Sequence, residues 1–385
     1  MVVHKNVKLL AWFNFFTDLR LYSPIAIVYF ANVSGSFALG MSVFSITMIF
    51  SALFEIPTGV FSDFIGRRKT VILGGVSAVA YSVFYAIGQS FFILAFAAVL
   101  EGLSRAFYSG NNDALLHGSL KETKSEHHYD EFLGRISAAF QIALAVSAII
   151  GSILANWSFA LIMWISVIPQ VVCLLLSFML KEPKVKTVES GNIYIHLKDG
   201  FSQFINNKKL RLLSLSSIIT EGLGEAAFHF QAAFYYTIWP LWAIGIAKAL
   251  SFVTASVSFH LSGRIIRRYG NLKILIFGSL YGRSIGIVAA AFPTILSPLL
   301  MSSTSLFYGV ASVAKNSLLQ KEFRDEQRAT MASLNAFAGS IFYAAVAFLL
   351  GLAADILSPA KGLLIIQILL IPVIFIYWRL ARYKD

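Results

Sequence analysis

The order of apolar and polar residues along the chain predicts a bundle of helices that cross a lipid bilayer. Long apolar runs, each close to the roughly 20 residues that span a hydrocarbon core, are separated by polar connections. We place twelve such runs at 7–30, 38–61, 70–87, 91–113, 132–154, 158–180, 211–236, 242–262, 273–292, 296–315, 328–352 and 361–380. The predicted fold class is therefore an all-α membrane protein with twelve transmembrane helices.

A polar segment and an internal repeat divide these runs into two halves. Residues 181–209 are rich in charges, and within them residues 193–205 alternate apolar and polar positions like a surface helix. A single shift along the sequence places Gly59 on Gly263, Gly66 on Gly270 and Asn112 on Asn316. We therefore expect a six-helix bundle over 1–180, a cytoplasmic linker over 181–209 and a second six-helix bundle over 210–385.

Composition and charge distribution support a membrane protein. Hydrophobic residues make up 57% of the chain and charged residues only 13%, so lipid must be the solvent for most of the surface. Most of the 31 Lys and Arg residues lie in alternate connections, including Lys315 at the end of the tenth run. This asymmetry predicts that both termini are cytoplasmic. It also accounts for the net charge of +12, so nucleic acid is not expected as a partner. The single cysteine, Cys173, excludes an internal disulfide.

Ionisable residues inside the apolar runs are functional candidates, because each is costly in hydrocarbon unless it is paired or wet. They are Asp18, Arg20, Glu55, Glu101, Arg105, Glu221, Glu225, His229 and Arg283. For Arg283 the sequence suggests no role. We interpret a further cation, Lys248, as an anchor whose amine reaches the membrane surface.

The seventh run carries three of these residues on one face. Glu221, Glu225 and His229 follow one another at intervals of four, which places them on a helical stripe roughly 12 Å long. Two carboxylates one turn apart repel, so we expect one of them to hold a proton near neutral pH. The functional hypothesis is a proton-coupling relay that faces a central cavity, and the alternative is simple bonding to neighbouring helices. Glu225 and His229 show no third ligand at metal spacing, so no metal or other cofactor is expected.

A second group of ionisable residues lies in the first and fourth runs. Glu101 and Arg105 are four residues apart and can neutralise one another, or Arg105 can instead pair with Asp18. On a continuous helix Asp18 and Arg20 point in different directions, so we expect only Asp18 to face the cavity.

Aromatic residues crowd the first and seventh runs, and they can either line a binding wall for amphiphiles or fill the packing. They are Phe13, Phe15, Phe16, Tyr22, Phe228, Phe230, Phe234 and Tyr235.

The connection between the second and third runs is a polar turn with three cations. It reads Gly59-Val-Phe-Ser-Asp63-Phe-Ile-Gly66-Arg67-Arg68-Lys69. This pattern resembles the signature loop of the major facilitator superfamily (MFS) at every defining position. The resemblance covers the whole chain, and it implies alternating access by rocking of two six-helix bundles. It also implies that Asp63 caps the eleventh helix near 328–332 and that Arg67 pairs with Asp113.

Within that superfamily the chain looks like compact bacterial drug or tetracycline exporters, as Glu55-Ile-Pro-Thr-Gly59 illustrates. Two features depart from these exporters. The fifth run lacks a Gly-Pro motif, and Ala98 stands where they carry an Arg, three residues before the Gln-Gly position that Glu101-Gly102 fills here. The leading hypothesis is a monomeric, proton-coupled exporter of amphiphilic or cationic small molecules in the bacterial inner membrane. The alternative is an importer or facilitator of a small polar or anionic metabolite, with Arg20 and Arg105 as clamps. An enzyme is not expected, since no Walker loop and no nucleophile elbow is present.

Overall fold

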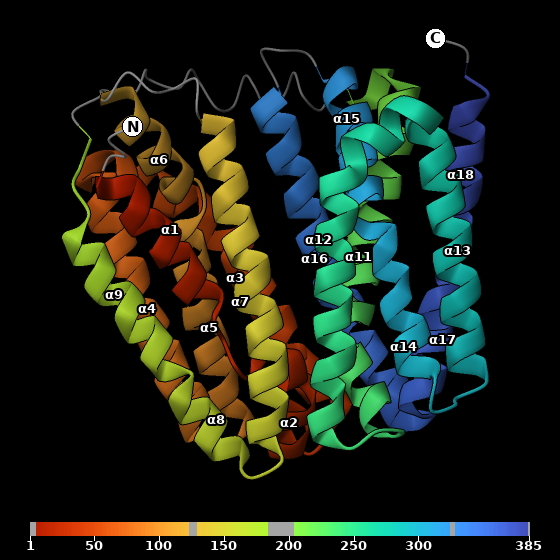
Figure 1. Ribbon diagram of the computed structural model, residues 1–385, viewed down its shortest axis with the longest axis horizontal. Helices are drawn as coiled ribbons and strands as arrows, with labels where there is room; N and C mark the ends of the chain where they lie inside the picture. Colours follow the sequence, from red (N-terminus) through yellow and green to blue (C-terminus); the bar gives the residue numbers. More distant parts are fainter. Residues whose placement is uncertain (1–4, 123–128, 184–203, 324–327, 384–385) are drawn as a thin grey trace. The chain divides into compact units, whose positions relative to one another are not determined.

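The computed structural model describes residues 5–122, 129–183, 204–323 and 328–383 (Figure 1). All regular elements in these ranges are helices. The chain forms two compact units: unit 1 comprises Met1–Thr187 with Pro240–Ala249, and unit 2 comprises Val188–Trp239 with Leu250–Asp385. The bundle boundaries expected from the sequence, 1–180 and 210–385, stay a prediction, as does the role of 181–209 as a linker. The surface helix expected at 193–205 lies largely outside the described residues.

Unit 1 is built from the helices of the first half of the chain. They are α1 (Lys5–Asp18), η1 (Ser23–Ile25), α2 (Ala26–Ser34), α3 (Phe37–Ile65), α4 (Arg67–Ile87), α5 (Phe91–Tyr108), α6 (Asn111–Glu122), α7 (Tyr129–Ala155), α8 (Phe159–Ile165) and α9 (Val167–Met179). Helix α5 packs against α3 and α4, and α1 packs against α7 and α9. Figure 1 shows α1 and α4 beside α9 in this unit.

Unit 2 is built from the helices of the second half. They are α11 (Lys208–Tyr236), α12 (Leu241–Tyr269), α13 (Asn271–Ala291), α14 (Ser297–Ser303), η3 (Thr304–Leu306), α15 (Tyr308–Glu322), α16 (Arg328–Ile356), α17 (Pro359–Leu369) and α18 (Ile371–Ala381). The first residues of α12 fall in unit 1. Helix α11 packs against α15, α16, α17 and α18, and α13 packs against α15, α17 and α18.

Several helix starts are set by local side-chain caps. Ser36, Ser90 and Ser158 precede α3, α5 and α8, and each hydroxyl accepts a hydrogen bond from a backbone N–H in the first turn. Asn207 and Ser358 cap α11 and α17 in the same way. Such caps satisfy backbone donors that the helix itself leaves unpaired. The connections before α3, α5, α8 and α17 can therefore be short, because the capping serine of each connection already begins the next helix.

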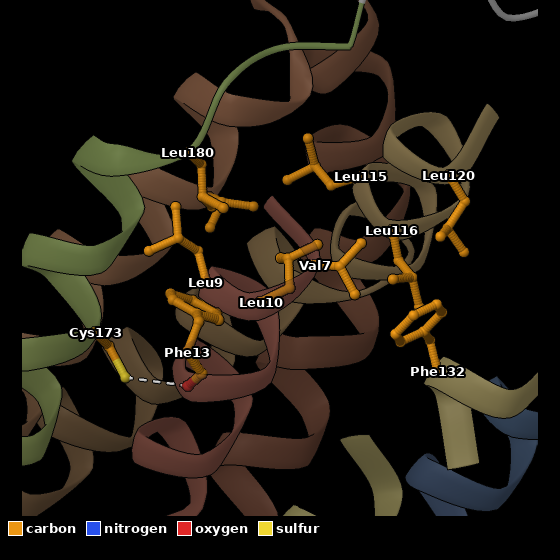
Figure 2. Packing of buried hydrophobic residues seen from close by; sticks show 11 residues of the cluster. Val7, Leu9, Leu10, Phe13, Leu115, Leu116, Leu120, Phe132, Cys173 and Leu180 are labelled. Carbon is orange, nitrogen blue, oxygen red and sulfur yellow. Dashed lines mark hydrogen bonds between the residues drawn. The ribbon is translucent and has the colours of Figure 1, made fainter. Parts of the chain in front are cut away.

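A hydrophobic cluster joins α1, α4, α6, α7 and α9 in unit 1. Figure 2 shows Leu10 and Phe13 of α1 at its centre, both fully buried, with Leu115 and Leu116 of α6 nearby. The Cys173 thiol donates a hydrogen bond to the Phe13 carbonyl oxygen over 3.4 Å. Cys173 is thus a buried packing residue, consistent with its place in an apolar run.

The helices have the length and the apolar surface that a bilayer requires. Within the described residues, eight helices are long and apolar enough to cross a membrane. Large apolar side chains remain exposed on them, such as Phe92, which is 81% exposed. The all-helical membrane fold predicted from the sequence is confirmed, whereas the number of twelve crossings stays a prediction. The runs outside these eight are interrupted, as in α1 with α2 and α14 with α15, or more polar, as in α11.

Candidate functional site

Glu101 is the centre of a buried polar cluster in unit 1. Its Oε1 accepts hydrogen bonds from Arg20 Nη1 at 2.6 Å and from Arg105 Nη2 at 2.9 Å and Nε at 3.2 Å. Its Oε2 accepts from the Tyr85 hydroxyl at 2.9 Å and from Thr47 Oγ1 at 3.4 Å. Charge-assisted hydrogen bonds of this kind are roughly twice as strong as neutral ones. Four other side chains therefore converge on the carboxylate of Glu101, whose side chain is only 9% exposed.

Close packing of α5 on α3 places these donors. Gly102 lies where a Cβ would come within 2.8 Å of the Thr47 carbonyl oxygen and the Ser51 nitrogen. Only glycine permits such an approach of two helix backbones. Thr47 is thereby brought to the Glu101 carboxylate, and Tyr85 reaches it from α4.

The break in the first predicted run explains how Arg20 joins this cluster. Helix α1 ends at Asp18, and the Arg20 N–H bonds to the Asp18 carbonyl oxygen at 2.8 Å before Pro24 enters the short turn η1. Arg20 Nη2 consequently lies 3.7 Å from Asp18 Oδ1. The expectation that Asp18 and Arg20 face different directions is wrong, because it assumed a continuous helix.

The ion pairs decide between the two hypotheses for Arg105. Arg105 pairs with Glu101, and no ion pair joins Arg105 to Asp18 in the described structure. The proposed Arg105–Asp18 pair is therefore wrong in this conformation. Arg105 instead pairs with Glu101, which lies one turn away on the same helix. Arg105 is the most accessible member of the cluster, with 42% of its side chain exposed.

In unit 2 the three residues of the acid stripe lie on α11 as predicted, but they have partners from other helices. Lys315 Nζ of α15 lies 2.6 Å from Glu221 Oε1, and the Ser217 hydroxyl donates to the same oxygen at 3.0 Å. The Tyr308 hydroxyl, also from α15, donates to Glu225 Oε1 at 3.4 Å. The stripe is thus bonded along one side by α15, where Tyr308 and Lys315 are two turns apart.

His229, the third member of the stripe, has aromatic surroundings. Its ring lies 6.1 Å from the rings of Tyr343 on α16 and of its neighbour Phe228, in edge-on geometry. Among the described residues, no group of three His, Cys, Asp or Glu side chains is arranged to hold a metal ion.

Lys315 is the functional candidate that sequence reasoning missed. We counted it with the cytoplasmic charges, yet its side chain is only 9% exposed, whereas that of Glu221 is 45% exposed. Its position in the sequence was the available signal that it is buried. Residues 309–314 before it are uncharged, and the next cation along the chain is Lys321. The ammonium group also offsets the repulsion between Glu221 and Glu225 from which the relay hypothesis began.

Two further sequence interpretations change with the structure. Lys248 is only 2% exposed, so it is a buried lysine rather than an anchor at the membrane surface. The expectation rested on its place near the end of the predicted run 242–262, but Lys248 lies two turns inside α12. The aromatic wall is also largely wrong. Five of its eight members are packed inside the units, namely Phe13, Tyr22, Phe230, Phe234 and Tyr235.

The polar turn between α3 and α4 has a cap that the sequence did not reveal. Gly66 has φ of 92°, in the region that favours glycine, and α4 starts at Arg67. The Glu182 carboxylate accepts hydrogen bonds from the backbone N–H groups of Arg67 at 3.0 Å and Arg68 at 2.6 Å. A carboxylate at a helix N-terminus satisfies free donors and complements the helix dipole. Glu182 therefore ties the residues after α9 to the start of α4.

Comparison with known proteins identifies the family. The sequence pattern of the Major Facilitator Superfamily matches residues 9–347. The chain belongs to the Major Facilitator Superfamily. It is accordingly a membrane transporter of small molecules and not an enzyme.

Relatives and solved structures agree with this assignment. The uncharacterized MFS-type transporter YxaM of Bacillus subtilis (strain 168) is 24% identical over 385 residues, which cover 95% of this chain and 93% of the relative. A mutant of the nucleoside transporter NupG matches with a TM-score of 0.83 at 12% identity, covering 98% of this chain and 100% of that chain. A bacterial homolog of the human lysosomal transporter Spinster, solved in an inward-facing and unoccupied conformation, matches with a TM-score of 0.77 at 14% identity, covering 98% and 96%. At these identities the structures show a shared fold.

The signature loop of this MFS chain has contacts that differ from those implied by the resemblance. Arg67 and Asp113 form no ion pair in the described structure, because Asp113 lies exposed in the first turn of the separate helix α6 while Glu182 holds the start of α4. The contact expected between Asp63 and residues 328–332 stays a prediction, since the side chains of 328–330 lie outside the described residues. Gly59 and Asp63 lie in the last two turns of α3, and Lys69 lies exposed in the first turn of α4.

The Glu101 cluster yields a matched pair of tyrosine substitutions. Tyr85→Phe removes a hydrogen bond to a buried carboxylate and should lower the free energy of unfolding by about 1.5–3 kcal/mol. Tyr22→Phe is the control, because the Tyr22 ring lies 5.7 Å from that of Tyr85 while its buried hydroxyl has no hydrogen-bond partner. Thermal unfolding of the two purified variants in detergent measures the difference, and equal midpoints would contradict the role of Tyr85.

The helix cap yields a second prediction. Glu182→Ala leaves the N–H groups of Arg67 and Arg68 without their carboxylate and should lower the unfolding free energy by about 0.5–2 kcal/mol. Glu55→Gln, which alters an exposed carboxylate that accepts a hydrogen bond from the Ser109 hydroxyl, is the control and should change little. Hydrogen exchange of the first turn of α4 localises the effect. Unchanged protection there in Glu182→Ala would show that the cap contributes nothing.

Proposed function

We propose that the chain is a proton-coupled secondary transporter that exports amphiphilic or cationic small molecules by alternating access. In this proposal it acts as a monomer in the bacterial inner membrane, with both termini in the cytoplasm. The observation that carries the proposal is the ion pair between the half-exposed Glu221 and the buried Lys315.

The Glu221–Lys315 pair couples a proton to helix packing. A buried ammonium group is costly without its counter-charge, so Lys315 holds α15 against α11 while Glu221 is ionised. A proton that reaches the exposed side of Glu221 neutralises the carboxylate and cancels the attraction. Lys315 must then find another partner or move toward water. Protonation therefore favours a different arrangement of α11 and α15, which is the link that a proton-driven transporter needs.

The charges of the two units support an amphiphilic or cationic substrate. In unit 1 the guanidinium groups of Arg20 and Arg105 are already engaged by Glu101. In unit 2 the stripe presents carboxylates, with Glu221 45% exposed. A positively charged substrate can compete with a proton for such a carboxylate, and this competition is the simplest form of antiport. The resemblance of the loop and of residues 55–59 to compact exporters points the same way.

A second candidate function rests on Arg105. Because 42% of its side chain is exposed, Arg105 can reach a carboxylate or phosphate of a substrate while Glu101 retains Arg20. This geometry favours an importer or facilitator of a small polar or anionic metabolite. The structural similarity to a nucleoside transporter is compatible with a polar substrate.

Replacing the acids tests the leading proposal. In vesicles, Glu221→Gln should abolish accumulation driven by a pH gradient while substrate counterflow continues, because only the proton-dependent step needs the carboxylate. Glu322→Gln is the control, since it removes an acid of the same helix α15 that pairs with Lys209 at 3.1 Å. Gradient-driven transport that persists in Glu221→Gln at the rate of the control would exclude this residue from coupling.

Inhibition by competing ions separates the two candidate functions. If the protein exports cations, lipophilic cations should block transport and Arg105→Gln should leave their apparent affinity within about twofold, which is less than 0.5 kcal/mol. If it carries anionic metabolites, small carboxylates should compete instead, and Arg105→Gln should weaken them by roughly tenfold or more. Flux measured against both inhibitor classes, in the wild type and in this variant, decides between them.

A further inference from the structure

Helix α13 carries three glycines on one face, and the structure packs two of them against other helices. A Cβ at Gly278 would lie 3.2 Å from Phe307, and a Cβ at Gly286 would lie 2.6 Å from the Gln367 side chain of α17. Gly282, between them, is buried, and apart from its two chain neighbours and the backbone of α13 no described atom lies within 4 Å of the place where its Cβ would be. Open space inside unit 2 therefore adjoins the middle of α13.

Arg283 follows Gly282 and has a buried guanidinium nitrogen without a partner. Its Nη1 atom is shielded from solvent and makes no hydrogen bond, and no carboxylate of the described residues forms an ion pair with it. Within hydrocarbon, a cation without a counter-charge is strongly unfavourable. A water molecule can accept one hydrogen bond from Nη1, but it cannot supply the missing negative charge.

Further polar groups near α13 also lack partners. The Gln367 Oε1 atom is buried and unbonded although the residue is only 6% exposed, and Thr220 Oγ1 of α11 is likewise unbonded. The Tyr377 hydroxyl of α18 lies close to Thr220 and Ser216 and within electrostatic range of Arg283. Tyr377 thus connects the unpaired hydroxyl of α11 with the unpaired cation of α13.

The carboxylates of the acid stripe do not solve the problem of Arg283. Glu221 is held by Lys315 and Ser217, and Glu225 accepts a hydrogen bond from Tyr308. Of the two, Glu221 reaches Tyr377 electrostatically, but it forms no ion pair with Arg283. Neither carboxylate therefore supplies the counter-charge of Arg283 in the described structure.

We propose that the interior of unit 2 between α11, α13, α17 and α18 binds one small monovalent anion of halide or formate size, with Arg283 Nη1 as the principal donor. The Thr220 and Tyr377 hydroxyls can donate to the same anion. The Gln367 amide, which packs one helical turn from Arg283, can rotate to present its NH2 group. One unpaired N–H among neutral polar groups suits an anion of one to three heavy atoms rather than a larger metabolite.

Anion binding of this kind has a signature in stability. An anion that binds the folded protein raises the unfolding temperature with its concentration and saturates. Wild-type protein purified in gluconate, which is too large for the site, should gain stability when chloride replaces gluconate at constant ionic strength. Formate is tested as a second probe, and a response to formate alone would identify a carboxylate as the preferred ligand.

Substitution of Arg283 is expected to change the unfolding temperature in an unusual direction. In gluconate, Arg283→Gln should unfold at the same temperature as the wild type or higher, because it removes a buried charge that has no partner. In chloride or formate the variant should show no added stability. Arg264→Gln, which changes an exposed arginine of α12 in the same unit, is the control and should keep the wild-type response.

A second variant and a direct measurement protect the test against a folding defect. Thr220→Val should raise the chloride concentration for half-maximal stabilisation by roughly fivefold to tenfold. Equilibrium dialysis with radiolabelled chloride should find about one saturable ion per wild-type chain and none in Arg283→Gln. The proposal is overturned if the wild type responds to neither anion, or if Arg283→Gln and Thr220→Val respond as the wild type does. No readout involves transport, so failure here leaves the proposed function untouched.

Discussion

Every ionised side chain inside the bundles must obtain its counter-charge from another part of the chain, because the surrounding hydrocarbon supplies neither water nor ions. Glu101 shows how this constraint shapes unit 1. Its two oxygens collect donors from α3, α4, α5 and the break after α1, so four segments are held at one point. Removing one buried partner from such a cluster costs more than the cluster contributes as a whole, since the groups left behind stay charged and dry. The cluster therefore fixes which helices lie together rather than simply adding stability.

The same constraint acts differently in unit 2, where the pair is asymmetric. The Lys315 side chain is buried, whereas that of Glu221 is half exposed. In unit 1 the carboxylate is the buried member, and its outermost partner is an arginine, which keeps its charge at any physiological pH. For this reason the proposal above assigns coupling to the Glu221–Lys315 pair in unit 2 and a positioning role to the Glu101 cluster in unit 1.

Residue patterns were informative about features that depend on local sequence. Apolar runs located the starts of α3, α5 and α8 to within a few residues, and the structure shows that Ser36, Ser90 and Ser158 cap these helices. The placement of Glu221, Glu225 and His229 on one stripe needed only helical periodicity. Partners from distant segments could not be inferred in this way. Lys315 is 94 residues from Glu221, and Glu182 is 115 residues from Arg67, so only the fold brings these pairs together. The Asp18–Arg20 contact was missed for another reason: a continuous apolar run hides the point at which a helix stops.

Arg283 shows what happens when the protein does not meet the requirement from its own residues. Arg20 and Arg105 face the same cost in unit 1, and both reach Glu101. Arg283 has polar neighbours in Tyr377, Thr220 and Gln367, but each of these is neutral, and two of them also lack hydrogen-bond partners. Neutral dipoles can solvate a cation only in part, which leaves a net positive potential around Arg283. In the proposal above, a small anion brings the charge that the helices do not provide.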